Sequence, residues 1–267
     1  MSKGSWYLIA AFVIVGAAVT NAIIFSPPVR DSQLCSSELE FGHTVILIDK
    51  SGPWAAAQSE RLKNHILRIA NTEMMQEERL TIYYFTSYTE FGFPHVFSFC
   101  KPQRTANPFV QSDLLVEKAY KKQFAAPLDQ VLERLKQPEK GLCSPIAETF
   151  LDILQRVETK KHKGPTRFVI FSDMLQNSKK YSFFDKDTCY QFPASMKPET
   201  FRLLRADSNL KMKTYILSQK SFVNFKDLSV DVYQVQGLYP DSWLSTARSA
   251  WTLWLAQWGT NLQWEKM

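Results

Sequence analysis

The chain has 267 residues with a formal net charge of +6, and 45% of its residues are hydrophobic. This length allows a membrane segment with one large domain, or two small domains, and the hydrophobic content suffices for a packed core. Nucleic acid is excluded as the expected partner, because the charge is spread along the chain and no basic face with interleaved aromatic residues is present.

An apolar segment without any charged residue, 6–25, lies near the amino terminus. About 20 such residues cross a bilayer as a helix, whereas the apolar part of a signal peptide is usually shorter. We therefore expect residues 1–5 to be cytoplasmic, 6–25 to be an uncleaved transmembrane anchor and 26–42 to be a tether; a cleaved signal peptide is the alternative. The charges around the segment favour an exported domain.

Four widely spaced cysteines, Cys35, Cys100, Cys143 and Cys189, show no zinc-binding pattern. An even number of cysteines in an exported domain is typical of disulfides. The residues by themselves leave the connectivity open, and buried free thiols are the alternative.

Strands and helices alternate through residues 43–267. The β-branched run 44–48 predicts a buried parallel strand, and apolar residues at helical spacing predict a helix over 54–72. Two strands are predicted at 79–86 and 96–99. Because the connection between them is so short, one of the two must run antiparallel to the main sheet.

A long helical region is predicted over 113–136, and Pro127 is expected to kink or divide it. Ser144 followed by Pro145 predicts an N-cap and the start of a helix that continues to Val157. The apolar run 167–171 predicts another buried strand. The remaining expected elements are a helix at 197–206, strands at 213–217, 230–235 and 261–265, and a helix at 242–258 capped by Gly259. The alternation predicts an α/β domain with a doubly wound, mostly parallel six-stranded sheet and helices on both faces.

Oxygen-bearing side chains follow two of the buried strands and precede one helix. Asp49 and Ser51 follow the first strand, Ser144 opens the third helix, and Ser172 and Asp173 follow the strand at 167–171. Loops after neighbouring parallel strands converge, so these side chains meet if the two strands are adjacent. Two carboxylates with hydroxyls suit an octahedral Mg²⁺ that keeps some of its water.

This pattern resembles a von Willebrand factor A-like domain with its metal-ion-dependent adhesion site. The stretch Asp49-Lys-Ser51-Gly-Pro53 resembles the first motif, Asp-x-Ser-x-Ser, and Ser172-Asp173 resembles the third. Ser144 falls where the family has the Thr of its second motif. The resemblance covers residues 43–265. Within the family, the chain looks like a group of bacterial membrane-anchored proteins with this fold.

Two departures from the family pattern concern the metal. Pro53 stands at the third position of the first motif and cannot coordinate through its side chain, and Ser144 replaces Thr. The alternative to a metal site is a degenerate one, in which Asp49 and Asp173 cap neighbouring helix N-termini and loop amides.

The resemblance implies a protein-interaction module, used in adhesion or as a scaffold. Together with the predicted anchor, it favours a component of a larger bacterial envelope assembly, held in the inner membrane with its domain in the periplasm. It implies Mg²⁺ or Mn²⁺ as cofactor, with Asp49, Ser51, Ser144 and Asp173 as ligands, and a carboxylate of a protein partner that completes the metal shell. The family topology places the end of the third strand and the loop before the third helix on the same side. The resemblance therefore also implies a Cys100–Cys143 disulfide, with Cys35 and Cys189 as the remaining pair.

No catalytic residue is predicted. The chain lacks an Asp-x-Asp pair after the first strand, a Gly-x-Ser-x-Gly elbow, a P-loop and a Gly-rich dinucleotide turn. The alternative function is a metal-dependent phosphoesterase-like hydrolase that uses the same acidic cleft.

The last helix is rich in tryptophan, which is common at interaction hot spots. Most of these rings are expected to pack on the sheet. Trp254 lies off the face formed by Leu244 and Leu255, so we expect it to be exposed and to form part of a partner surface.

Overall fold

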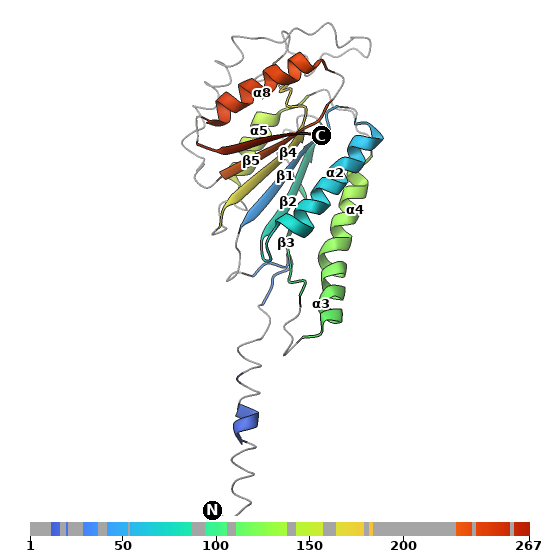
Figure 1. The fold of residues 1–267 in the computed structure, drawn as a ribbon, viewed down its shortest axis with the longest axis vertical. Coiled ribbons are helices and arrows are strands. Elements are labelled where there is room, and N and C mark those ends of the chain that lie inside the picture. The colour runs from blue at the N-terminus through green and yellow to red at the C-terminus, as the bar shows by residue number, and fades with distance from the viewer. Residues whose placement is uncertain are drawn as a thin grey trace, which may run out of the picture.

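A six-stranded sheet in the order β3-β2-β1-β4-β5-β6 forms the centre of this computed structural model (Figure 1). All neighbouring strands are parallel except β3, which runs antiparallel to β2. The strands are β1 (His43–Asp49), β2 (Arg79–Phe85), β3 (His95–Cys100), β4 (Thr166–Ser172), β5 (Leu228–Gln234) and β6 (Asn261–Lys266). Six of the predicted strands are confirmed, including the antiparallel one.

The structure describes residues 12–16, 20, 29–36, 42–52, 54–86, 94–105, 111–137, 143–156, 164–178, 182–183, 228–236, 239–256 and 259–267. The predicted helix at 197–206 and strand at 213–217 lie outside these residues, as do Pro53 and Cys189. Most of the predicted anchor 6–25 also lies outside them; its described part, 12–16 and 20, is helical. Within the described ranges, no helix is long and apolar enough to cross a membrane.

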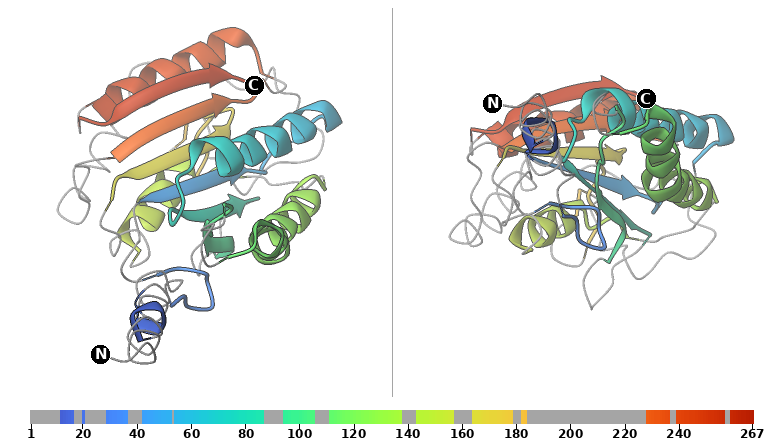
Figure 2. Two further views of the ribbon diagram at one scale, coloured as in Figure 1. Left: turned by 60° about the horizontal axis from the view of Figure 1, so that its bottom comes forward. Right: turned by 90° about the horizontal axis from the view of Figure 1, so that it is seen from below.

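Helices cover both faces of the sheet (Figures 1 and 2). One core lies between the sheet and the helices of the 56–135 region, and the other lies between the sheet and the two later helices. The first group is α2 (Ala56–Arg68), η1 (Ile69–Glu73), α3 (Asp113–Tyr120), η2 (Lys121–Ala125) and α4 (Ala126–Leu135), and the second is α5 (Ile146–Gln155) and α8 (Asp241–Ala256). Because both faces are covered, all seven residues of β1 are buried, as expected of a central parallel strand.

The long helical region is divided as predicted. Its α-helical parts, α3 and α4, are separated by the π-helical turn η2, and Pro127 lies at the beginning of α4. Proline has no backbone N–H to donate to the preceding turn, so a change of hydrogen-bonding pattern just before Pro127 removes the conflict.

The predicted cap Gly259 follows the last helix, α8: its φ is 68° and its N–H donates to the carbonyl of Ala256, the last residue of that helix, at 3.1 Å. The prediction that Trp254 is exposed is wrong, because its side chain is only 3% exposed. Its ring packs edge-on against Phe150 of α5 and against Trp251. Because α8 packs against α5 as well as against the sheet, its buried face includes residues beyond those that point at the sheet.

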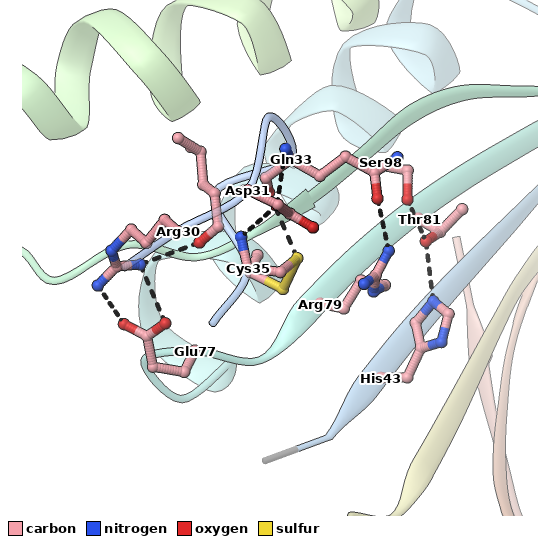
Figure 3. Close-up of a disulfide and its surroundings, with 11 residues drawn as sticks. Arg30, Asp31, Gln33, Cys35, His43, Glu77, Arg79, Thr81 and Ser98 are labelled. Atoms are coloured by element: carbon pink, nitrogen blue, oxygen red, sulfur yellow. Dashed lines mark hydrogen bonds and ion pairs between the residues drawn. A yellow bond between two sulfur atoms is a disulfide. The ribbon is translucent and has the colours of Figure 1, made fainter. Parts of the chain in front are cut away.

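The predicted Cys100–Cys143 disulfide is also wrong, because Cys100 is bonded to Cys35 (Figure 3). The antiparallel direction of β3 places Cys100 opposite Arg79, at the edge of the sheet where the parallel strands begin. Cys143 immediately precedes Ser144, which lies at the edge where those strands end. Cys143 is itself disulfide-bonded, and its partner lies outside the described residues.

Residues 29–36, within the predicted tether, are held on this starting edge of the sheet. The Arg30 guanidinium contacts the Glu77 carboxylate at 2.5 and 3.0 Å and donates to the Leu34 carbonyl at 3.0 Å. The Cys100 N–H donates to the Gln33 carbonyl at 2.9 Å. An ion pair, a disulfide and main-chain bonds therefore fasten this part of the tether to the end of the domain opposite Asp49 (Figure 3).

Candidate functional site

Three hydroxyl groups converge on the carboxylate of Asp49, the last residue of β1. Ser51 donates to Oδ1 at 2.5 Å through its hydroxyl and at 3.0 Å through its backbone N–H. Ser144 donates to Oδ2 at 2.6 Å, and Ser172, the last residue of β4, donates to the same oxygen at 2.7 Å. Because β1 and β4 are adjacent parallel strands, the predicted residues meet at one edge of the sheet as the topology requires.

Ser144 reaches Asp49 because it does not cap a helix. The N-cap position of α5 is Pro145, which makes no side-chain capping bond, so the prediction of a capping role for Ser144 is wrong. The backbone of Ser144 is paired with that of Asn177, with N···O distances of 2.7 and 2.9 Å. This short bridge turns the Ser144 side chain towards β1, where its hydroxyl becomes part of the site.

Asp173 supplies the second carboxylate. Its Oδ1 accepts a hydrogen bond from the Leu175 N–H at 2.9 Å. Burial of its side chain and the negative charge of Asp49 raise the pKa of Asp173 to about 8, because the charged form loses solvation and faces a like charge. The turn is fixed by Met174, whose φ is 64° and whose N–H donates to the Ser172 hydroxyl at 2.8 Å.

Lys50 lies between two site residues in the sequence but its ammonium group points elsewhere. The Lys50 Nζ donates to the carbonyls of Leu135 and Gln137, at 2.6 and 2.8 Å, at the end of α4. In the part of the chain that the structure describes, no Lys, Arg or His forms an ion pair with Asp49 or Asp173. Among the described residues, the negative charge of Asp49 therefore acts on Asp173 without an ion pair from either acid to a protein cation.

Tyr239, in the connection between β5 and α8, is a neighbour of the site that the sequence did not reveal. Burial, Asp173 and Asp49 raise the pKa of its phenol to about 12, since a phenolate would lose solvation and add a further negative charge beside the two carboxylates. Its ring is stacked on that of Trp243, with 5.7 Å between centroids. No motif marks this tyrosine; only the packing of α8 brings it to the site.

The described donor set fits a hard divalent cation. It consists of oxygen atoms only, which Mg²⁺ and Mn²⁺ prefer. A serine hydroxyl that donates its hydrogen to Asp49 still has lone pairs that can face a cation, so the observed bonds and coordination are compatible. Within the described ranges, no three Asp, Glu, His or Cys residues are grouped as metal ligands. The hydroxyls of Ser51 and Ser144, and water, would therefore complete a set that contains only two carboxylates.

The alternative to a metal site, in which Asp49 and Asp173 cap helix N-termini and loop amides, agrees only in part with the structure. Asp49 and Asp173 do accept hydrogen bonds from the loop amides of Ser51 and Leu175. Neither acid caps α2 or α5, the described helices that begin nearest to them, because that role belongs to two glutamines. Gln58 Oε1 accepts from the Ala55 N–H at 2.9 Å at the start of α2, and Gln176 Oε1 accepts from the Ala147 N–H at 2.8 Å at the start of α5. Capping of α2 and α5 therefore does not account for the two carboxylates.

No protein-family model and no curated protein matches the chain. Among solved structures, the pilus adhesin SpaC from Lactobacillus rhamnosus GG aligns at 12% identity with a TM-score of 0.45, over 80% of this chain and 26% of the adhesin. The VWA domain of SpRpn10 aligns at 11% identity with a TM-score of 0.34, over 85% of this chain and 88% of that domain. The manganese-loaded TRAP protein of Plasmodium vivax aligns at 11% identity with a TM-score of 0.34, over 79% of this chain and 63% of TRAP.

The chain thus spans about a quarter of the adhesin's length. At these scores the alignments carry no argument about function, and the assignment of the fold rests on the molecule itself. The sheet has the order β3-β2-β1-β4-β5-β6 with one antiparallel strand, and the three predicted motifs meet at Asp49. In fold, the chain is therefore similar to von Willebrand factor A-like domains.

Proposed function

We propose that this chain is a membrane-anchored protein-interaction module that binds a carboxylate of its partner through Mg²⁺ or Mn²⁺. The cation is held by Asp49, Ser51, Ser144 and Asp173, and residues 6–25 are the anchor. The observation that carries the proposal is the pair of electrostatically coupled carboxylates, Asp49 and Asp173. Three hydroxyls bond to Asp49, and neither acid forms an ion pair within the described residues. A divalent cation balances this charge and offers the partner an open coordination position.

Protonation of the Asp173 carboxyl makes the metal affinity of the site depend on pH. Because the pKa of Asp173 is about 8, the Asp173 carboxyl is mainly protonated at neutral pH when no cation is bound, and a cation must displace that proton. Metal affinity therefore increases as the pH rises from 6.5 to 8.5, in a range where an isolated aspartate would already be fully ionised.

A non-enzymatic role is supported by the positions of the described histidines. His43 contacts Thr81 at the opposite edge of the sheet, His65 packs against Tyr233, and His95 packs against Tyr83. His43 lies at the other end of β1 from Asp49, and neither His65 nor His95 forms a hydrogen bond or ion pair with Asp49 within the described residues.

The test is a titration of the full-length chain with Mg²⁺ and with Mn²⁺ at pH 6.5 and 8.5, followed by calorimetry and thermal unfolding. Wild type should bind and gain thermal stability, more at pH 8.5, whereas Asp49→Asn should do neither. Asp152→Asn is the matched control, because Asp152 is an exposed carboxylate paired with Arg156 on α5. An equal gain of stability in wild type and Asp49→Asn would contradict the metal site.

The partner is tested by cross-linking and co-purification of the full chain. A partner that is recovered with Mg²⁺, released by EDTA and lost in Asp49→Asn supports the proposal. Turnover of generic phosphoesters that disappears in Asp49→Asn would instead favour the hydrolase.

A further inference from the structure

A polar pocket of about 220 Å³ opens between the amino-terminal half of α8 and the carboxyl ends of β5 and β6. Leu244 forms its apolar floor, and its polar lining includes Gln234, Ser245, Arg248 and Lys266. Among the described residues, two cationic side chains line the pocket, those of Arg248 and Lys266, and a single carboxylate, that of Asp241. Its net charge is therefore positive, in contrast to the acidic site at Asp49.

The cationic groups of this pocket are not neutralised within the described part of the chain, where neither Arg248 nor Lys266 forms an ion pair. Arg248 is nevertheless held in place, because its guanidinium lies 5.1 Å from the centre of the Trp264 ring. The Trp264 indole N–H donates in turn to Thr252 at 3.1 Å. A guanidinium stacked on an aromatic face keeps its in-plane N–H groups directed outward, which suits a carboxylate.

The pocket and the acidic site are neighbours on the same face of the sheet. Ser172, Gln234 and Lys266 are in register across β4, β5 and β6. The Gln234 amide group lines the pocket and donates to the backbone carbonyls of Leu244 at 3.1 Å and Asp173 at 3.4 Å. One buried side chain therefore separates the acidic site from the basic pocket.

We propose that this pocket binds a second carboxylate of the same protein partner, so that the partner presents two acidic side chains to the domain. One acid completes the cation shell at Asp49 and Asp173, and the other pairs with Arg248 and Lys266. The inference rests on the proposed function for the first contact only. The second contact depends on direct charge pairing and needs no metal.

The geometry limits the spacing of the two acids. Adjacent strands lie about 4.8 Å apart. Lys266 on β6 is therefore two strand spacings, or about 10 Å, from the end of β4 and three, or about 14 Å, from the end of β1, and the cation lies between those two strands. An extended peptide advances about 3.3–3.6 Å per residue. The two acids of the partner should therefore be separated by one to three residues.

The test uses synthetic peptides of the form acetyl-Asp-(Gly)n-Asp-amide, with n from 0 to 4, and matched peptides in which the second Asp is replaced by Asn. Binding to the full-length chain is measured with Mg²⁺ and with EDTA, from the NMR signals of the tryptophan indole N–H groups, among which Trp264 reports on the pocket. For n of 1 to 3, the two-acid peptide should bind about tenfold more tightly than its Asn partner, as expected of one charge-assisted pair.

Four variants test which side chain produces the preference for the two-acid peptide. Arg248→Gln should abolish the tenfold preference, and Lys266→Gln, whose side chain is at the surface, should reduce it without disturbing the Trp264 packing. Asp241→Asn should increase the preference, because it removes the negative charge of the pocket. Lys121→Gln, an exposed lysine on the other side of the sheet, should leave the preference unchanged.

The two proposals fail in different ways. A preference that is absent in wild type, or unchanged in both Arg248→Gln and Lys266→Gln, overturns the pocket proposal even if Mg²⁺ strengthens binding of every peptide. Binding that is insensitive to Mg²⁺ and EDTA but retains a preference that depends on Arg248 overturns the metal-dependent function and supports the pocket.

Discussion

The hydroxyl of Ser144 donates a hydrogen bond of 2.6 Å to Oδ2 of Asp49, across 95 residues of sequence. This bond joins the residue before α5 to the end of β1. The hydroxyl of Ser172, the last residue of β4, donates to the same oxygen at 2.7 Å. The site is therefore shaped by three separate parts of the chain before any cation binds.

Ser144→Ala removes a donor to a buried carboxylate and is expected to lower the free energy of unfolding by about 1–2 kcal/mol. It should also weaken Mg²⁺ binding, because one hydroxyl ligand is lost. Urea unfolding and calorimetry measure the two effects. Ser249→Ala is the control, since the Ser249 hydroxyl is exposed on α8 and donates to the Ser245 carbonyl of the preceding turn. Equal behaviour of the two variants would contradict the role of Ser144.

Asp173→Asn should change the pH dependence of stability. The folded-state pKa of Asp173 is about 8, above its ordinary value of 3.8. Between these values the folded chain binds a proton that the unfolded chain does not, so this group's contribution to stability falls as the pH rises from about 4 to 8.

Without divalent cations, Asp173→Asn should therefore melt at a higher temperature than wild type at pH 8.5 and at nearly the same temperature at pH 4. A gain of several degrees is expected, because 1 kcal/mol corresponds to about 2–4 °C in a chain of this size. Melting curves that keep the same separation at both pH values would show that the raised pKa is absent.

Lys50→Met tests the buried ammonium beside the site. The variant keeps the length of the side chain but leaves the Leu135 and Gln137 carbonyls without the donor they have at 2.6 and 2.8 Å. A loss of about 2–4 kcal/mol in the free energy of unfolding is expected. Lys121→Met, at an exposed position of η2, should be nearly neutral, and an equally small effect of Lys50→Met would be inconsistent with the buried contacts.

Peptide mapping without reduction should recover Cys35 linked to Cys100, which are 65 residues apart. The variant Cys35→Ser/Cys100→Ser should be destabilised by about 2–4 kcal/mol, because a loop of this length is no longer closed in the unfolded state. Recovery of a Cys100–Cys143 peptide instead would restore the pairing first expected.

The ion pair of Arg30 with Glu77 is tested by a double-mutant cycle. The Glu77 side chain is only 7% exposed, so Arg30→Met leaves a buried carboxylate without its partner and should lower the free energy of unfolding by about 1–3 kcal/mol. Glu77→Gln in the same chain should recover part of the loss, because it removes the uncompensated charge. Additive losses in the double variant would exclude coupling between the two side chains.

The sequence by itself determined most elements of this protein and the edge at which its site lies. The buried run 44–48, the division at Pro127 and the cap at Gly259 follow from hydrophobic period and backbone preference, which act between residues close in the chain. Asp49 and Asp173 are predicted to meet because the ends of parallel strands share one edge, whereas the family resemblance added Ser144 from the start of a helix.

Only the tertiary structure decided which distant groups meet. The reversed direction of β3 carried Cys100 to Cys35 instead of Cys143. The contact of α8 with α5 buried Trp254, and the same helix assembled the basic pocket around Arg248. These relationships depend on strand direction and on the packing of elements far apart in sequence, and a local pattern of residues contains neither.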